Sequence, residues 1–221
     1  MPSNTTNTTT KTFTIRPRTT EDLPSLAEVL RSVYANSGYP VQGPANASRN
    51  LGAITSATDN NNNNKAWVAV NNDNGVVVGH VALLSSGGGG QNVSTNLAVA
   101  LWRAKAKAKA KRAQDEEKEA QKEKEEDTEK EEKEKLAVLG WLFIHPDHRG
   151  RGLASRLIDA VLKEAHERGE RVLLFALVKD QDAIRLYRRL GWVFYGNVTY
   201  RWVDGDGRRR EMEGECFASP V

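Results

Sequence analysis

The chain has one cysteine in 221 residues, which excludes a framework of intramolecular disulfides. No apolar run approaches the roughly 18 residues that a membrane span requires. The 32 basic and 29 acidic side chains nearly cancel, to a formal net charge of +3, so overall charge by itself indicates no nucleic-acid or membrane partner. No cluster has the spacing of zinc ligands. These absences predict a globular protein without a bound metal.

The first residues, MPSNTTNTTTKT, contain no basic region followed by an apolar core, and no arginine precedes Arg16. A secretory signal has the first feature, and a mitochondrial presequence is rich in arginine. We therefore expect a cytoplasmic protein, with the nucleus as the alternative. Residues 1–11 are predicted to be a disordered polar tail. The remainder, 12–221, is long enough for one domain with an insertion.

The stretch HPDHRGRGLA at 145–154 is the most informative part of the chain. The apolar run before it, 136–144, predicts a buried strand, and the amphipathic run after it, 153–168, predicts a helix. Backbone N–H groups at a helix start lack intrahelical partners and attract anions, and glycines allow a ligand to come close. The spacing matches neither a Walker A loop nor a dinucleotide fingerprint. The stretch therefore predicts a different site for a phosphorylated ligand.

A second patterned segment follows. Residues 172–178 form a near-continuous apolar run, which predicts a covered strand parallel to the one at 136–144. The segment DQDAIRLYRRLGW at 180–192 predicts a short helix. Asp180 or Asp182 can cap its start, and Gly191 can end it.

Together these segments resemble two hallmarks of the GCN5-related N-acetyltransferase (GNAT) superfamily. Arg149-x-x-Gly152-x-Ala154 resembles its pyrophosphate loop. The second segment resembles its Asn-x-x-Ala-x-x-Leu-Tyr-x-x-x-Gly-Phe pattern, with Asp180 in place of Asn and Trp192 in place of Phe. The resemblance is strong over 136–195, weaker over 12–85 and absent over 86–135.

The resemblance implies a mixed α/β (α+β) acyl-CoA N-acyltransferase fold with the order β-α-α-β-β-β-α-β-α-β-β. Its mostly antiparallel sheet would splay between the fourth and fifth strands. The sequence pattern agrees with this order, with a strand from Phe13, a helix capped by Thr20, and a short helix within 45–55. Hairpins are predicted over 66–84 and 193–217.

The implied activity is direct transfer of an acetyl group from acetyl-CoA to a primary amine. In the family, backbone amides at the end of the fourth strand hold the pantetheine arm and the acetyl carbonyl. A tyrosine acts as general acid to the leaving thiolate, and this role maps to Tyr187, which could instead be a packing aromatic. The residues expected to bind the cofactor are Leu142, Phe143, Ile144, Arg149, Gly150, Arg151, Gly152, Leu153, Ala154, Asp180 and Tyr187.

The general base is not evident, because the strand 136–144 carries no carboxylate. His80 could act through a water or be a satisfied core histidine. His145 and His148 flank the phosphate loop and are expected to serve ligand binding or solvation. Cys216 lacks a partner for nucleophilic catalysis, so no covalent thiol step is expected. Aromatic candidates for the acceptor pocket, which are equally compatible with the core, are Tyr39, Trp141, Tyr195 and Trp202.

The acceptor is left open between a small-molecule amine, a protein N-terminus and a protein lysine. A non-catalytic acyl-CoA-binding or scaffold protein is the alternative from another class. The sequence carries no signal for an oligomeric state.

The segment 86–135 interrupts the pattern between the third and fourth strands. A glycine run and an apolar piece, 97–102, precede a low-complexity stretch that is basic first and acidic last. Its helix propensity is high, but it lacks an apolar stripe. We expect a solvated, fraying helix that is dispensable for the chemistry. The composition favours a spacer over a nucleic-acid contact or a protein-docking arm. The apolar piece is the part that could dock on the body.

Overall fold

The computed structural model describes residues 12–35, 37, 51–52, 54–55, 63–86, 93–120, 134–203 and 207–220. The predicted tail, most of the predicted helix at 45–55, and residues 121–133 lie outside this range. The elements are β1 (Phe13–Pro17), α1 (Leu23–Ala35), β2 (Lys65–Asn71), β3 (Val77–Ser85), α3 (Val93–Ala120), β4 (Lys135–Ile144), α4 (Leu153–Glu167), β5 (Glu170–Leu177), α5 (Gln181–Arg189), β6 (Val193–Val203) and β7 (Arg209–Ala218).

The described strands form one seven-stranded sheet in the order β1-β2-β3-β4-β5-β7-β6. Every neighbouring pair is antiparallel except β4 and β5, which run parallel and are joined through α4. The predicted mixed sheet, its strand–helix–strand crossover and its two hairpins are confirmed.

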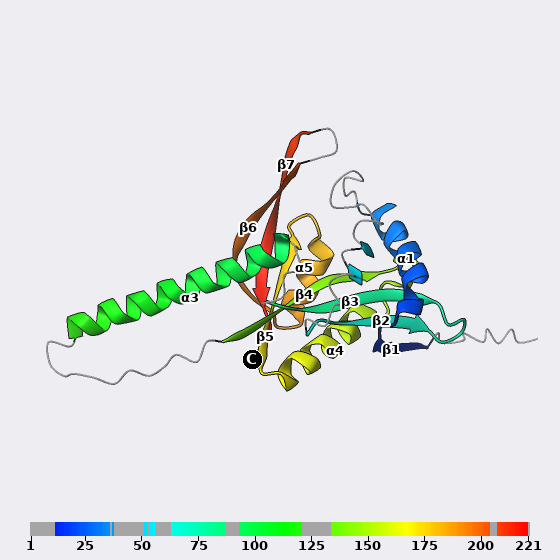
Figure 1. Cartoon of the computed structure of the whole chain (residues 1–221), viewed down its shortest axis with the longest axis horizontal. Helices are drawn as coiled ribbons and strands as arrows, with labels where there is room; N and C mark the ends of the chain where they lie inside the picture. Colours follow the sequence, from blue (N-terminus) through cyan, green and yellow to red (C-terminus); the bar gives the residue numbers. More distant parts are fainter. Residues whose placement is uncertain are drawn as a thin grey trace, which may run out of the picture.

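The sheet is covered on both faces (Figure 1). Alternation along β3 shows how the sequence achieves this, because Val81 and Leu83 join the core under α4, whereas Ala82 and Leu84 join the core on the opposite face. That opposite face carries α1 over one cluster and the start of α3 over another.

The chain enters α1 through a 3-10 turn at Thr20–Asp22. Thr19, not Thr20, is the capping residue, because the Asp22 carboxylate accepts a hydrogen bond from the Thr19 N–H at 2.8 Å. Arg16 donates to the same carboxylate from both terminal guanidinium nitrogens, at 2.6 and 2.8 Å. Burial alone would raise the pKa of Asp22, but the bonds from Arg16 and Thr19 outweigh it and hold the pKa below its usual value.

The helix α3 packs on the body at its amino-terminal part and is exposed over the rest. Ala98 and Val99 are buried, and the Tyr195 hydroxyl donates to the Ala98 carbonyl at 2.9 Å. At Gly196, an added Cβ would lie 2.9 Å from Leu101 Cδ2, so α3 sits directly on β6. The apolar piece 97–102 therefore docks on the body, and the expectation that 86–135 is dispensable for the chemistry stays a prediction.

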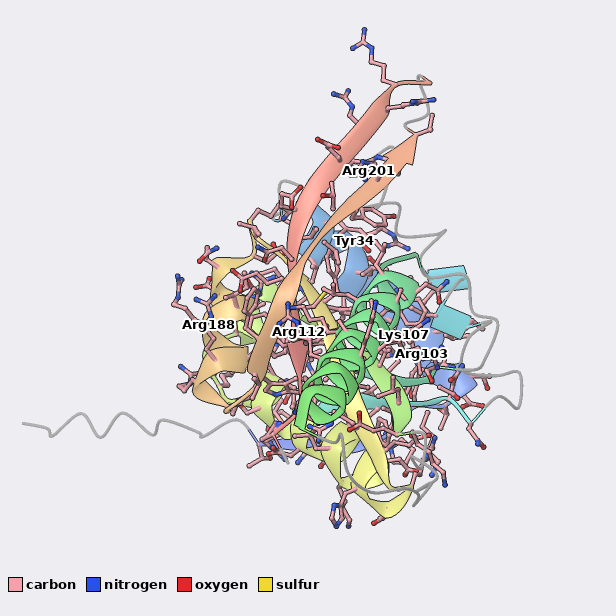
Figure 2. All side chains as sticks on the ribbon, turned by 90° about the vertical axis from the view of Figure 1, so that its left-hand side faces the viewer. Tyr34, Arg103, Lys107, Arg112, Arg188 and Arg201 are labelled. Atoms are coloured by element: carbon pink, nitrogen blue, oxygen red, sulfur yellow. The ribbon has the colours of Figure 1, made fainter. Side chains whose placement is uncertain are left out.

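Beyond Trp102, the described part of α3 leaves the body. Residues 103–109, 111 and 112 are exposed, and Figure 1 shows the helix extending away from the sheet. Figure 2 labels Arg103, Lys107 and Arg112 on this helix and Arg201 on the protruding β6–β7 hairpin. The helix itself continues to Ala120.

Candidate active site

The sheet opens between β4 and β5. Their parallel pairing covers only Lys135–Val138 and Glu170–Leu173. Past this point β5 pairs with β7 on its other side, while β4 continues along β3 to Ile144. Residues 139–144 therefore have no strand on their β5 side, and backbone groups there remain available for a ligand. This is the predicted splay.

A β-bulge lies in β4 at the splay. The register with β3 pairs Gly140 with Ala82 and Phe143 with His80, so Trp141 and Leu142 oppose the single residue Val81. Trp141 has φ = 49°, in the left-handed region. Such a conformation costs a bulky side chain about 1–3 kcal/mol and persists where the surroundings enforce it.

The phosphate loop joins β4 to α4 at the same end of the sheet. Gly150 and Gly152 have φ of 71° and 72°, and a Cβ at either position would meet no atom of the described chain within 4 Å beyond its local backbone. Gly152 is the N-cap of α4 and no side chain caps the helix start, so its first N–H groups lack an intrahelical acceptor. The Arg149 side chain donates from Nε to the Ile144 carbonyl at 3.3 Å, which ties the loop to the end of β4. The geometry is that of an anion cradle.

Several of the predicted cofactor residues can contribute only backbone atoms. The Leu153 side chain is buried in the core, and Ile144 and Phe143 are buried on opposite faces of the sheet. Leu142 packs against the α4 side. Arg149, Gly150, Arg151 and Gly152 are exposed, and Ala154 is half-buried.

Asp180 starts α5, as predicted, but through its backbone. Its carbonyl accepts from the Ala183 and Ile184 N–H groups at 3.0 and 3.1 Å. Its carboxylate pairs instead with the Lys179 ammonium at 2.9 Å. A role of Asp180 in cofactor binding stays a prediction.

Tyr187 lies on the buried face of α5, in the same core cluster as Ile144 and Leu153. Its ring packs edge-on to Trp192, with centroids 5.7 Å apart. Burial, and then the charge of Asp180, raise the pKa of Tyr187 above its usual value, so the phenol is protonated at neutral pH. Its role in the chemistry stays a prediction.

His80 is completely buried on β3. Burial lowers its pKa to about 4, and the nearby Arg18 adds to this effect, whereas the bond to the Trp141 carbonyl and the charge of Asp22 oppose it. His80 is thus a core residue with one ring nitrogen hydrogen-bonded, and a base role through a water stays a prediction.

The depressed pKa of His80 predicts a loss of stability in mild acid. The unfolded chain takes up the proton below its pKa of 6.5, whereas the folded chain does so only near 4. The contribution is thus complete above pH 6.5 and is lost as the pH falls toward 4. At about 1.36 kcal/mol per pH unit, about 3 kcal/mol should disappear over this window.

Urea unfolding between pH 7 and 4 measures this loss. The variant His80→Phe should have a flatter profile, since it removes the titrating group and keeps a ring on Phe143. Equal slopes for the two proteins would contradict the assignment.

The other candidates have structural roles in the described chain. The Nδ1 of His145 accepts from the Asp147 N–H at 3.3 Å and caps the 3-10 turn Pro146–His148, while the His148 ring packs edge-on to Phe13. Burial raises the pKa of the Cys216 thiol to about 11, which opposes a nucleophilic role.

Of the four aromatic candidates for an acceptor pocket, Tyr195 belongs to the core under α3. Trp141 and Trp202 are half-buried, and the Trp202 ring stacks on Tyr200 with centroids 5.5 Å apart. Tyr39 lies outside the described residues. Trp141 and Trp202 therefore stay candidates.

Within the described residues, no group of three or more His, Cys, Asp or Glu side chains could hold a metal. The same part of the chain contains no helix with the length and apolar character to cross a membrane.

A split sheet beside an anion cradle is an arrangement that can accommodate an extended, phosphorylated ligand between two strands. The sequence profile of the acetyltransferase (GNAT) family matches residues 35–192. The chain therefore belongs to this family.

Two curated relatives match shorter stretches. An uncharacterized N-acetyltransferase of Methanocaldococcus jannaschii is 39% identical over 59 residues, which are 26% of this chain and 26% of that protein. The L-amino acid N-acyltransferase MnaT of Escherichia coli is 30% identical over 70 residues, 28% of this chain and 41% of that protein. The match thus spans less than half the length of either relative.

Among solved structures, Arabidopsis thaliana NAA60 in complex with acetyl-CoA superposes with a TM-score of 0.58 at 16% identity. The superposition covers 94% of this chain and 97% of that one. This similarity supports the fold.

Proposed function

We propose that the protein transfers the acetyl group of acetyl-CoA to a primary amine. The observation that carries this proposal is the splay between β4 and β5 next to the left-handed glycines of the phosphate loop. The loop would hold the pyrophosphate on backbone N–H groups, assisted by Arg149 and Arg151. The pantetheine arm would lie along the free edge of β4, at Leu142, Phe143 and Ile144.

The reaction is a direct displacement. The amine nitrogen attacks the thioester carbonyl carbon, and the carbonyl electron pair moves onto oxygen. Collapse of this tetrahedral intermediate restores the carbonyl, breaks the C–S bond and releases the CoA thiolate. The nitrogen loses a proton and the thiolate gains one, so the products are an N-acetylamine and CoA. Amides of β4 facing the splay would stabilise the oxyanion.

Tyr187 is the proposed proton donor to the thiolate. Its motif position and its place in the same core cluster as Ile144 support this role. The raised pKa keeps the phenol protonated at neutral pH, so the group that would meet the thiolate is the protonated acid.

Replacing Tyr187 with phenylalanine should lower kcat about 100-fold, as expected for loss of a general acid, with little change in acetyl-CoA affinity. The ring packing against Trp192 is kept, so the melting temperature should change little. Tyr195→Phe is a matched control, because that hydroxyl binds Ala98 on the other face of the sheet. It should affect stability without affecting kcat. A normal kcat for Tyr187→Phe would make Tyr187 a packing residue.

Thiol release from acetyl-CoA in the presence of an amine panel tests the function itself. The panel begins with L-amino acids, the class named for the Escherichia coli relative, and continues with polyamines, peptides with free N-termini and lysine peptides. Selective turnover of one class identifies the acceptor. Tight acetyl-CoA binding without turnover of any amine would indicate an acyl-CoA-binding or scaffold protein.

We propose a cytoplasmic location, since the only cysteine is a buried free thiol. The exposed part of α3 is proposed as a spacer. A partner protein bound to it stays the alternative, and deletion of this part in a pull-down experiment would distinguish the two.

A further inference from the structure

His80 lies beside the β4 bulge. Its Nδ1 is 3.0 Å from the Trp141 carbonyl oxygen, and its ring stacks on Phe143 with centroids 5.2 Å apart and planes 19° apart. It therefore contacts one residue of the bulge and the residue that follows the bulge.

The contact with Trp141 defines the tautomer. A carbonyl oxygen only accepts, so Nδ1 carries the proton and donates it, and Nε2 carries the lone pair. Within the described residues, this buried Nε2 has no hydrogen-bond partner. The imidazole is thus a neutral donor, and burial with Arg18 nearby keeps it neutral at physiological pH. Asp22 is the acidic group whose charge acts on it in the opposite sense.

The bulge determines which way the backbone of β4 faces. Leu139 packs on the α4 side, Trp141 on the opposite side, and Leu142 again on the α4 side. In a regular strand, residues 139 and 141 would share a face. Without the bulge, the residues after Gly140 would shift by one position along β3, and the N–H and C=O groups at the splay would turn by about half a turn.

Trp141 is held in its left-handed conformation from two directions. Its side chain packs between the clusters under α1 and α3, and its carbonyl accepts the His80 proton. Without the bond to His80, the carbonyl would be free to turn toward the open β5 side of the strand.

We propose that His80 is a positioning residue for acetyl transfer, which holds the Trp141 carbonyl away from the splay so that the following amides point at the acetyl carbonyl. The inference rests on the proposed function. It differs from a general-base role, because the imidazole gives no proton to and takes none from the substrate.

Two amide variants separate these roles. His80→Asn places an N–H near the position of Nδ1, whereas His80→Gln carries its N–H one bond further and cannot reach Trp141 in the same way. Both variants bury an amide, so general effects on folding are matched. Circular dichroism and melting temperature confirm that each is folded.

Acetyl-CoA labelled with ¹³C at the thioester carbonyl gives a readout that requires no acceptor. Bound to the unmutated protein and to His80→Asn, its resonance should move downfield, because a donor polarises the carbonyl. In His80→Gln the resonance should remain near its solution value, with acetyl-CoA affinity unchanged. Acetyl transfer by His80→Gln should be about 100-fold slower, the typical cost of misplacing catalytic groups by about 1 Å.

The possible outcomes are distinguishable. Equal carbonyl shifts in the two variants would overturn the positioning role. So would loss of the same limb of the pH–rate profile in both variants, because that result would make His80 a general base. If the unmutated protein does not bind acetyl-CoA, the proposed function is wrong, and so is the positioning role that rests on it. If the unmutated protein binds and turns over acetyl-CoA but the two variants behave alike, only the positioning role of His80 is wrong.

Discussion

Replacing Gly152 with valine should weaken acetyl-CoA binding at least about 100-fold, the equivalent of one or two lost charge-assisted hydrogen bonds. Gly152 has φ = 72°, and beyond the local backbone no atom of the described chain lies within 4 Å of a Cβ built there. That space lies at the start of α4, where the pyrophosphate is expected. A valine side chain would occupy it and keep the phosphate oxygens from the N–H groups. Calorimetric titration with acetyl-CoA measures the loss.

Gly169→Val is a close control for this experiment. Gly169 follows the other end of α4, has φ = 64°, and also has no protein atom within 4 Å of a Cβ. A left-handed side chain costs about 1–2 kcal/mol at either position, so both variants should lose similar stability. Only Gly152→Val should lose acetyl-CoA. If both bind normally, or both lose binding equally, the loop is not the pyrophosphate site.

The carboxyl-terminal half was predictable because its signals are local. The run at 136–144, the glycines of the loop and the amphipathic stretch from Leu153 each indicate their element without reference to the rest of the chain. The structure has these elements as β4, the phosphate loop and α4, with bounds within about two residues of the prediction. The resemblance to the acetyltransferases then supplied the splay, which no local pattern encodes.

The bulge at Trp141 and the role proposed for His80 were not predictable in this way. A bulge is a property of the pairing between two strands, and His80 and Phe143 are 63 positions apart in the sequence, so neither local pattern encodes it. Tryptophan gives no local signal for a left-handed conformation, since it is disfavoured there. The sequence indicated His80 only as an isolated polar residue in an apolar strand.

The start of α3 was the least certain element for a related reason. Its apolar piece has no periodic stripe of its own, and its contacts with Tyr195 and Leu136 come from distant strands. The charged remainder, in contrast, was predicted from composition alone, because solvated helix requires no tertiary partner.

Excision of residues 103–133 should leave the fold and acetyl-CoA binding intact. Trp102 Nε1 donates to the Glu134 carboxylate at 3.0 Å, so the two ends of the excised stretch already lie together and a short Gly-Ser turn can join them. Arg171 pairs with Glu134 and lies 5.6 Å over the Trp102 ring, which fixes this junction. Because a shorter loop loses less entropy on closure, the melting temperature should stay the same or rise slightly.

The wider excision of 87–134 should have a large effect. It removes the docked base of α3, uncovers Tyr195 and Cys216, and leaves the Tyr195 hydroxyl without the Ala98 carbonyl. Losing the burial of Val99 and Ala98 and the partial burial of Leu101 and Trp102, at about 1.5–3 kcal/mol for a fully buried side chain, should destabilise the protein by about 3–5 kcal/mol. For a chain of this size that corresponds to a fall in melting temperature of about 10 °C. Calorimetric scans and acetyl-CoA titrations of both excised proteins measure these effects. If the protein lacking 103–133 loses its fold or its acetyl-CoA binding, the charged part of α3 is a component of the fold or of the active site.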